Sequence, residues 1–228
     1  MIELNPHHKS SGSTAVSGHS LNGWRARYYD FGNSLFGVSL VTRRHLQLIS
    51  MSPGQSLLDV GCGTGEVIHR LHRKFGGTVR LCGIDPSEDI LEVARRKLRD
   101  AGNITLGVGK SEQLSFPDEH FDWVVSSLTF HHLPRHLRRR SLTEIHRVLK
   151  PGGSLLVTDF GVPVNVMGRM FGKIWAGHSF TSDNLADGLE DLILAQGFTD
   201  LNVSVQAGAM YHTLVRKATN KLAPATRH

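Results

Sequence analysis

Residues 57–67, LLDVGCGTGEV, constrain the fold of this chain more than any other segment. A run suited to a buried strand, which includes Asp59, is followed at once by Gly61, Gly63 and Gly65. Glycine is favoured where the backbone must adopt a positive φ or pass close to another group. The segment therefore predicts a strand, a tight loop with a ligand beside it, and then a helix.

Strand-like and helix-like segments alternate after a turn at residues 51–54. The predicted strands are residues 56–60, 79–84, 104–108, 123–128 and 155–159. The predicted helices are residues 65–75, 87–101 with Ser87 as N-cap, and 136–149, the last ended by Pro151-Gly152-Gly153. Such alternation predicts a parallel sheet with helices on both faces.

The C-terminal part of the chain follows another pattern. Residues 160–180 show no clear strand, residues 183–196 are typical of a helix, and residues 198–206 and 210–216 predict two strands joined by a short turn. A short turn between strands indicates an antiparallel hairpin. The fold class expected is α/β: a doubly wound, Rossmann-like, seven-stranded, mostly parallel sheet with a C-terminal antiparallel hairpin.

The length of 228 residues suits one domain with a substantial core. We expect a flexible lead-in over residues 1–22, a single domain with an N-terminal helical cap over 23–217, and a basic flexible tail over 218–228. No apolar run approaches the ~20 residues that span a bilayer, and no secretory pattern opens the chain. With two cysteines and no disulfide framework, a cytoplasmic location is expected.

The net charge of +6 invites a nucleic-acid or membrane interpretation. The basic residues lie mostly in helix-like segments, at 95–99 and 135–140, and in the tail. Basic helix faces are usually solvated, so nucleic-acid binding is not expected. Peripheral contact with an anionic membrane stays open, and the sequence does not fix the oligomeric state.

The glycine spacing argues against a dinucleotide. The dinucleotide fingerprint needs glycine at relative positions 1, 3 and 6. Gly61 and Gly63 fit, but the sixth position is Glu66 and the third glycine comes early, at Gly65. A carboxylate in the first turn of the helix would repel a diphosphate. It would tolerate a ligand that carries an ammonium and a sulfonium, such as S-adenosylmethionine.

Five motifs in order resemble the class I S-adenosylmethionine-dependent methyltransferases, in their small-molecule group. Residues 57–65 resemble motif I of that family, and Ile84-Asp85-Pro86-Ser87 is similar to its motif II. The segments LSFPDEHFD (114–122), FHHL (130–133) and VLKPGG (148–153) complete the set. The resemblance runs from about Tyr28 to Val215. It implies a methyltransferase with S-adenosyl-L-methionine as cofactor.

The resemblance also implies which residues hold the cofactor. The loop and motif II would supply Asp59, Gly61, Cys62, Gly63, Gly65, Asp85 and Pro86. Among these, Asp59 would order the loop and Asp85 would bind the ribose. Ser111 and Glu112 would lie beside the adenine, Ser127 would line the cleft, and Tyr29, next to Asp30, would cover the cofactor. At the position before Ser111 the family commonly has Asp, whereas this chain has Lys110.

Catalytic candidates follow from the position of the ligand in open α/β sheets, outside the carboxyl ends of the strands. Residues after the fourth and fifth strands are His131, His132, Thr129, Asp159 and Asn165. A histidine can serve as a base near neutral pH, and Tyr29 is a further candidate. In an extended segment His131 and His132 would point in opposite directions, so at most one would act. His69 and His72 share a helix face, but no metal site is expected.

Motifs that the sequence lacks exclude several classes of methyl acceptor. Residues 126–129, SSLT, lack the Asn/Asp-Pro-Pro-aromatic box of nucleic-acid amino methylation, and neither cysteine is placed for covalent base methylation. Arsenite methylation would require several thiolates to hold the soft metalloid, and two core cysteines do not suffice. A small-molecule acceptor remains. Residues 162–180, with Met167, Met170, Phe171, Ile174, Trp175 and Phe180, would make an apolar wall, together with Trp24, Tyr28 and Phe36.

The acceptor is therefore expected to be small and apolar or aromatic, with the atom that receives the methyl group left open. Three alternatives remain. One is a membrane-surface methyltransferase that acts on a quinone precursor or lipid. Another is a protein that binds S-adenosylmethionine without transferring the methyl group. The third is a nicotinamide oxidoreductase.

Overall fold

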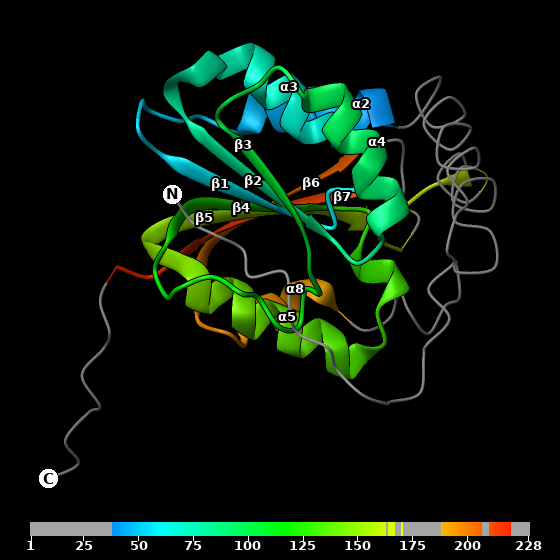
Figure 1. Cartoon of the computed structure of the whole chain (residues 1–228). Coiled ribbons are helices and arrows are strands. Elements are labelled where there is room, and N and C mark those ends of the chain that lie inside the picture. Colours follow the sequence, from blue (N-terminus) through cyan, green and yellow to red (C-terminus); the bar gives the residue numbers. More distant parts are fainter. Residues whose placement is uncertain (1–37, 163, 167–169, 171–187, 207–209, 220–228) are drawn as a thin grey trace, which may run out of the picture.

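The computed structural model describes residues 38–162, 164–166, 170, 188–206 and 210–219, and structural statements below concern these residues (Figure 1). They form one seven-stranded sheet in the order β3-β2-β1-β4-β5-β7-β6. The strands are β1 Ser56–Val60, β2 Arg80–Asp85, β3 Ile104–Val108, β4 Phe121–Ser127, β5 Leu149–Phe160, β6 Phe198–Gln206 and β7 Met210–Lys217. The first five are parallel, and β7 is antiparallel to both β5 and β6. The predicted α/β fold class is confirmed.

Helices cover both faces of this sheet (Figure 1). On one face lie α2 Val38–Leu48, α3 Glu66–Phe75 and α4 Glu88–Leu98, and on the other lie α5 Arg135–Val148 and α8 Leu189–Leu194. Two short 3-10 turns, η1 Gly76–Thr78 and η2 Phe130–His132, follow α3 and β4. The order in which strands are added to the sheet reverses at β1: β2 and β3 lie on one side of it, and β4 and β5 lie on the other. This switch point is where open α/β sheets bind ligands.

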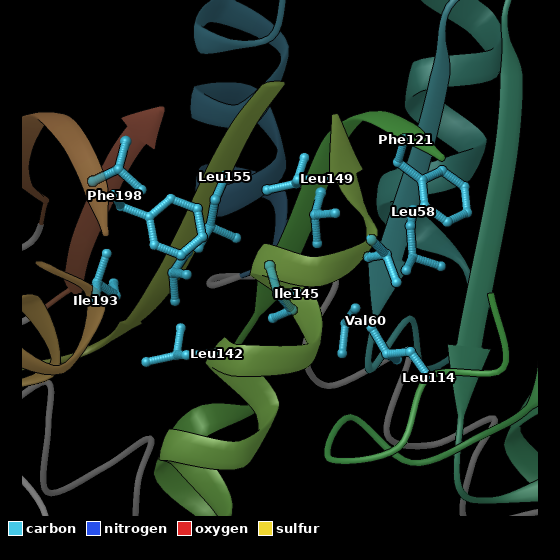
Figure 2. Close-up of a cluster of buried hydrophobic side chains, with 14 of the residues drawn as sticks. Leu58, Val60, Leu114, Phe121, Leu142, Ile145, Leu149, Leu155, Ile193 and Phe198 are labelled. Atoms are coloured by element: carbon cyan, nitrogen blue, oxygen red, sulfur yellow. The ribbon is translucent and has the colours of Figure 1, made fainter. Parts of the chain in front are cut away.

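Alternate residues of the central strands supply two separate hydrophobic cores. Leu58 faces the α5 and α8 side, where it packs in one cluster with Phe121, Ile145 and Phe198 (Figure 2). Leu57 belongs to the other cluster, with α3 and α4. Every residue of β1 is buried, which explains why residues 56–60 do not alternate between apolar and polar.

Most predicted elements match the structure to within a few residues, and two local differences have physical causes. β5 starts at Leu149 rather than 155, because Leu149 already pairs with Phe121 before a register shift around Pro151 and Gly152. Ser87 does occupy the N-cap position of α4, but its side chain makes no cap hydrogen bond. The Asp85 carboxylate accepts from the Ser87 N–H instead, at 2.9 Å.

Several expectations fall on residues outside the described ranges. They are the N-terminal cap with Trp24, Tyr28, Tyr29, Asp30 and Phe36, most of the predicted wall at 162–180, and the turn between β6 and β7. Within the described chain, none of the helices is long and apolar enough to cross a bilayer.

Candidate active site

The loop between β1 and α3 uses its three glycines in different ways. All have positive φ: 76° at Gly61, 52° at Gly63 and 75° at Gly65. A Cβ on Gly61 would lie 2.3 Å from Thr129 Oγ1, and one on Gly65 would lie 2.9 Å from Leu98 Cδ1. A Cβ on Gly63 would meet no heavy atom of the described chain within 4 Å. The outer two glycines therefore permit protein packing, whereas Gly63 faces open space beside the switch point.

Asp85, at the end of β2, holds this loop in place. Its Oδ2 accepts a hydrogen bond from the Gly63 N–H at 3.0 Å, while its Oδ1 accepts the Ser87 N–H bond already described. Burial raises the pKa of Asp85, and these two hydrogen bonds oppose the rise. Each carboxylate oxygen carries a second lone pair. Asp85 can therefore order the loop and still accept hydrogen bonds from ligand hydroxyls.

Asp59, on β1, is a second buried acid, and its hydrogen bonding differs from that of Asp85. Its side chain is 1% exposed, and its Oδ1 has no hydrogen-bond partner among the described residues. Burial and then the charge of Asp85 raise the pKa of Asp59 to about 8. The resemblance implied that Asp59 orders the loop, but the loop amide of Gly63 donates to Asp85 instead.

These features fit S-adenosylmethionine. The space at Gly63 admits close approach of a ligand to the backbone, and Asp85 offers acceptors to a pair of ribose hydroxyls. The unpartnered oxygen of Asp59 is a buried acceptor suited to a cationic ligand. The loop therefore has the donor and acceptor set that this cofactor requires.

Glu66 does not oppose an anion as strongly as the sequence suggested. Its carboxylate accepts hydrogen bonds from Arg70 Nε at 2.7 Å and from Lys97 Nζ at 3.4 Å. Burial alone would raise the pKa of Glu66, but these two cations outweigh it and lower the pKa. Its charge is compensated within the protein, so the case against a dinucleotide rests on the glycine spacing.

Cys62 lies within the glycine loop and Pro86 within motif II, and the two residues differ in exposure. Cys62 is buried beneath the loop, and its N–H donates to the Ile84 carbonyl at 2.9 Å. Burial, first of all, raises the pKa of its thiol, followed by the charges of Asp59 and Asp85. Pro86 is exposed between Asp85 and α4. Cys62 therefore supports the loop by packing and by its backbone.

The segment predicted to meet the adenine packs onto α5. Ser111 is 8% exposed, and its Oγ lies 2.7 Å from Ser141 Oγ on that helix. Glu112 is half-buried, with its Oε2 3.4 Å from the Ser111 hydroxyl, and Lys110 is exposed. Since the Ser111 hydroxyl is engaged with α5, Glu112 is the better acceptor for an adenine amino group.

The end of β4 lies directly against the glycine loop. Leu128 has a φ of 54°, which is uncommon for a residue with a branched side chain. Its N–H donates to the Thr158 carbonyl at 2.8 Å, and Thr129 Oγ1 lies 3.2 Å from the Ser127 carbonyl. Such backbone strain concentrates at functional sites. It turns the chain so that Thr129 meets Gly61 and η2 follows at the edge of the sheet.

His131 and Asp159 form a hydrogen-bonded pair at this edge. His131 Nδ1 lies 2.7 Å from Asp159 Oδ1, and the His131 backbone N–H donates to Asp159 Oδ2 at 3.1 Å. The carboxylate is 3% exposed and also accepts the Phe160 N–H at 2.8 Å. An acceptor at Nδ1 places the proton of a neutral imidazole there, which leaves the Nε2 lone pair as a base. The sequence offered both residues as candidates but did not predict that they pair.

The expectation that His131 and His132 point in opposite directions is wrong. It assumed an extended backbone, whereas both residues lie in η2. Their ring centroids are 3.8 Å apart, with the planes inclined by 44°. His132 is exposed, and Asp159 bonds His131. Asn165, also exposed, lies on the segment after β5.

A cavity of about 320 Å³ opens beside the pair. Its polar lining includes Arg138 from α5, Glu190 from α8 and Tyr211 and Thr213 from β7, with Phe130, Phe160, Val162 and Leu189 among its apolar residues. Sequence reasoning missed Glu190, Tyr211 and Thr213. The insertion of β7 next to β5, which pairs Tyr211 with Asp159, brings Tyr211 and Thr213 to the site, whereas α8 brings Glu190.

No group of three or more His, Cys, Asp or Glu side chains within the described ranges could hold a metal ion. Cys62 and Cys82 are free thiols.

Comparisons with known proteins agree on one kind of relative. The family model described as "Methyltransferase domain" matches residues 57–153. The ubiquinone/menaquinone biosynthesis C-methyltransferase of Shewanella frigidimarina is 32% identical over 161 residues, covering 68% of this chain and 62% of that protein. The corresponding protein of Geobacter sulfurreducens is 35% identical over 154 residues, covering 65% and 58%. The chain thus spans less than two thirds of the length of these relatives.

Solved structures share the fold. An S-adenosylmethionine-dependent methyltransferase from Aquifex aeolicus superposes with a TM-score of 0.66 at 19% identity, over 86% of this chain and 98% of the other. Phosphoethanolamine N-methyltransferase 2 of Haemonchus contortus, in complex with S-adenosyl-L-methionine, gives 0.69 at 18% identity, over 88% and 58%. The [4+2]-cyclase SpnF gives 0.63 at 20% identity, over 79% and 81%. The fold alone therefore does not fix the reaction.

Proposed function

Because this chain belongs to the class I S-adenosylmethionine-dependent methyltransferase family, we propose that it transfers a methyl group to a small acceptor at the carboxyl edge of β4 and β5. The observation that carries the proposal is the His131–Asp159 pair, which lines a cavity large enough for a small acceptor. When bound, S-adenosylmethionine supplies an electrophilic methyl group on a sulfonium, which is already a good leaving group.

The glycine loop and the end of β2 would hold this cofactor. Gly63 lets the backbone approach it, Asp85 accepts hydrogen bonds from its ribose, and Asp59 lies beneath the loop as a buried acid. We propose further contacts from Glu112 on the adenine side and Ser127 at the end of β4. A contact from Tyr29, which lies outside the described residues, is also proposed.

His131 would act on the acceptor. Its Nε2 removes the proton from the attacking hydroxyl, thiol or acidic carbon as the new bond to the methyl carbon forms. Asp159, fixed by the amides of His131 and Phe160, holds the ring orientation and stabilises the imidazolium that results. The bond between the methyl carbon and the sulfonium would break in the same step. The sulfonium thereby becomes neutral, and the positive charge ends on the His131 imidazolium.

The acceptor we favour is a hydroxylated ring. The printed names of the relatives are those of quinone-biosynthesis C-methyltransferases, which supports a quinone precursor as a specific candidate. The cavity supports it too, because Phe130 and Phe160 can pack against a ring, while Glu190 and Thr213 can pair with its polar substituents. An acceptor of this kind combines the apolar surface expected from the sequence with hydrogen-bonding groups.

We extend the proposal to the location of the protein in the cell and to its contact with a membrane. The free thiols of Cys62 and Cys82 fit a reducing compartment, and so support the cytoplasm. A lipid-dissolved acceptor would require the protein to touch a membrane surface. The exposed residues Arg139 and Arg140 of α5 would favour an anionic one.

A screen with labelled methyl donor tests the proposal. The protein is incubated with cell extract and S-adenosylmethionine labelled at the methyl group, and labelled compounds are separated and identified. We expect one small hydroxylated product, absent from a parallel incubation with the Asp85→Ala variant. Tight cofactor binding without any labelled product across extracts would instead identify a protein that binds the cofactor without transfer.

A further inference from the structure

Asp59 is the buried acid of the cofactor site that the transfer reaction does not use. It belongs to β1, where it pairs with Gly83 of β2 and Val125 of β4, so apolar or glycine positions flank it in the sheet. Its side chain is 1% exposed, and its Oδ1 has no hydrogen-bond partner among the described residues. A charged carboxylate in such a position lacks both solvent and compensating donors.

Among the described residues, the ionisable groups that act on Asp59 do not supply a counter-charge. From β2, Asp85 presents a second carboxylate, and from the loop the Cys62 thiol feels the negative charge of both acids. Val125 of β4 is neutral. Arg95 of α4 acts against the rise in the pKa of the neighbouring Cys62 but is not among the groups that shift the pKa of Asp59, and it is paired with Glu88 at 2.7 Å. The surroundings therefore favour an uncharged Asp59.

A cationic ligand would reverse this preference. S-adenosylmethionine has an ammonium, a sulfonium and one carboxylate, so it brings net positive charge to the space at Gly63. A nearby positive charge stabilises the ionised form of an acid, whereas burial alone stabilises the neutral form. Proton and cofactor thus compete for the same negative group.

We propose that Asp59 carries a proton while the cofactor site is empty and releases it to solvent when S-adenosylmethionine binds. The O–H bond of the carboxyl group breaks, the proton passes to the buffer, and the positive charge of the cofactor takes its place. The burial and the Asp85 charge described above act in the same direction, since both raise the pKa of Asp59 in the empty site. The inference rests on the proposed cofactor but not on methyl transfer, so it stands or falls without any acceptor.

Proton release has a consequence for affinity. Below the raised pKa of Asp59 the proton must be removed before the carboxylate can meet the cation. The affinity for the cofactor therefore rises with pH, by up to about tenfold per pH unit for one proton. The α-amino group of the cofactor itself titrates near pH 8, so the contribution of Asp59 is defined by comparison with a variant that cannot ionise.

Calorimetric titration of the full chain with S-adenosylmethionine at pH 7 counts the protons directly. The binding enthalpy is measured in buffers of different ionisation enthalpy, such as phosphate and Tris, and its slope gives the number of protons released. We expect the wild-type chain to release nearly one proton more than Asp59→Asn. The matched control Asp100→Asn, at a side chain that is 92% exposed, should behave as the wild type.

The same proton count for wild type and Asp59→Asn would overturn the proposal. Asn has the shape of a protonated Asp, so this variant is expected to fold, and its thermal unfolding checks that it does. A second measurement does not depend on the variant: the Asp59 carboxyl carbon is followed by NMR in the empty, isotopically labelled protein. Titration well above pH 6 is expected, and titration below pH 5 would contradict the proposal. A chain that releases the proton but methylates nothing would retain this inference and lose the proposed function.

Discussion

His131 Nδ1 and Asp159 Oδ1 lie 2.7 Å apart, although the two residues are 28 positions apart in the sequence. His131 follows β4, and Asp159 lies at the carboxyl end of β5. The pair exists because β4 and β5 are parallel neighbours whose carboxyl ends meet at one edge, with Ser127 opposite Thr158. The backbone amides of His131 and Phe160 also donate to this carboxylate and fix its position. The ring is therefore oriented by the fold, and its second nitrogen is left for chemistry.

Asp159→Asn should slow methyl transfer ~10²-fold or more, because the imidazole loses the acceptor that sets its tautomer and stabilises its charged form. Affinity for S-adenosylmethionine should stay within about twofold. The rate is measured with the acceptor identified by the label screen, over a range of pH. His132→Ala is the control, at the neighbouring histidine, and should keep most of the activity. Equal rates for wild type and Asp159→Asn would remove the pair from the mechanism.

Gly61→Ala and Gly63→Ala should separate stability from binding. Both residues have positive φ, which costs an alanine about 1 kcal/mol. The new Cβ at residue 61 would also collide with Thr129, whereas at residue 63 it enters open space. We expect the larger fall in unfolding free energy for Gly61→Ala. For Gly63→Ala we expect a fall limited to the backbone strain of about 1 kcal/mol, together with loss of cofactor affinity. Urea denaturation and calorimetry measure the two quantities, and the reverse order would contradict the site.

Two buried histidines should make stability depend on pH. His45 Nε2 lies 2.6 Å from Thr158 Oγ1, which lies 2.8 Å from His212 Nδ1. Burial, followed by the charge of His212, lowers the pKa of His45 to about 3; burial, followed by Arg44, lowers that of His212 to about 4. The unfolded chain binds these protons below pH 6.5 and the folded chain does not. Stability from each neutral ring is therefore present above pH 6.5 and lost as the pH falls toward 4.

The measurement compares wild type with His45→Gln, because Asp59 contributes with the opposite sign over the same range: its raised pKa makes stability fall as the pH rises from 4 to 8. Lowering the pH from 7.5 to 5 should reduce the stability advantage of wild type over His45→Gln by about 2 kcal/mol in urea denaturation. A difference that does not change with pH would show that His45 is not buried in its neutral form.

Glu190→Gln should raise the KM for the acceptor several-fold and leave the affinity for S-adenosylmethionine unchanged. The Glu190 carboxylate lies in the cavity wall, with its Oε1 3.4 Å from Thr213 Oγ1, on the side of the sheet away from α3 and α4. Steady-state kinetics with the identified acceptor measures the effect. Glu92→Gln, at an exposed site on α4, is the control. An unchanged KM would exclude this cavity as the acceptor site.

The sequence predicted the sheet, its C-terminal hairpin and the ligand loop, because each depends on local signals: runs of buried residues, short connections and glycines at fixed spacing. It did not predict the partners across the sheet. Asp85 accepts a hydrogen bond from the loop amide, while an oxygen of Asp59 has no partner in the described part of the chain. This difference depends on three strands packed side by side. The sequence indicated that the Glu66 carboxylate would repel a diphosphate, but it did not predict that α4 brings Lys97 beside that carboxylate.

The acceptor side was the least predictable part. Glu190, Tyr211 and Thr213 carry no local motif. Tyr211 and Thr213 reach the cavity because β7 is inserted between β5 and β6, and Glu190 reaches it from α8. The strained backbone of Leu128 has no signature either, since leucine rarely adopts a φ of 54°.

The account depends above all on the space at Gly63 holding S-adenosylmethionine against Asp85. Titration calorimetry with this cofactor, for wild type and Asp85→Ala, tests that claim most directly. The account predicts saturable one-to-one binding to wild type and an affinity weaker by ~1–3 kcal/mol, or about 5- to 150-fold, for the variant, because the loop amide and the ribose hydroxyls lose their acceptor. Equal affinities, or binding of NADH in place of S-adenosylmethionine, would contradict it.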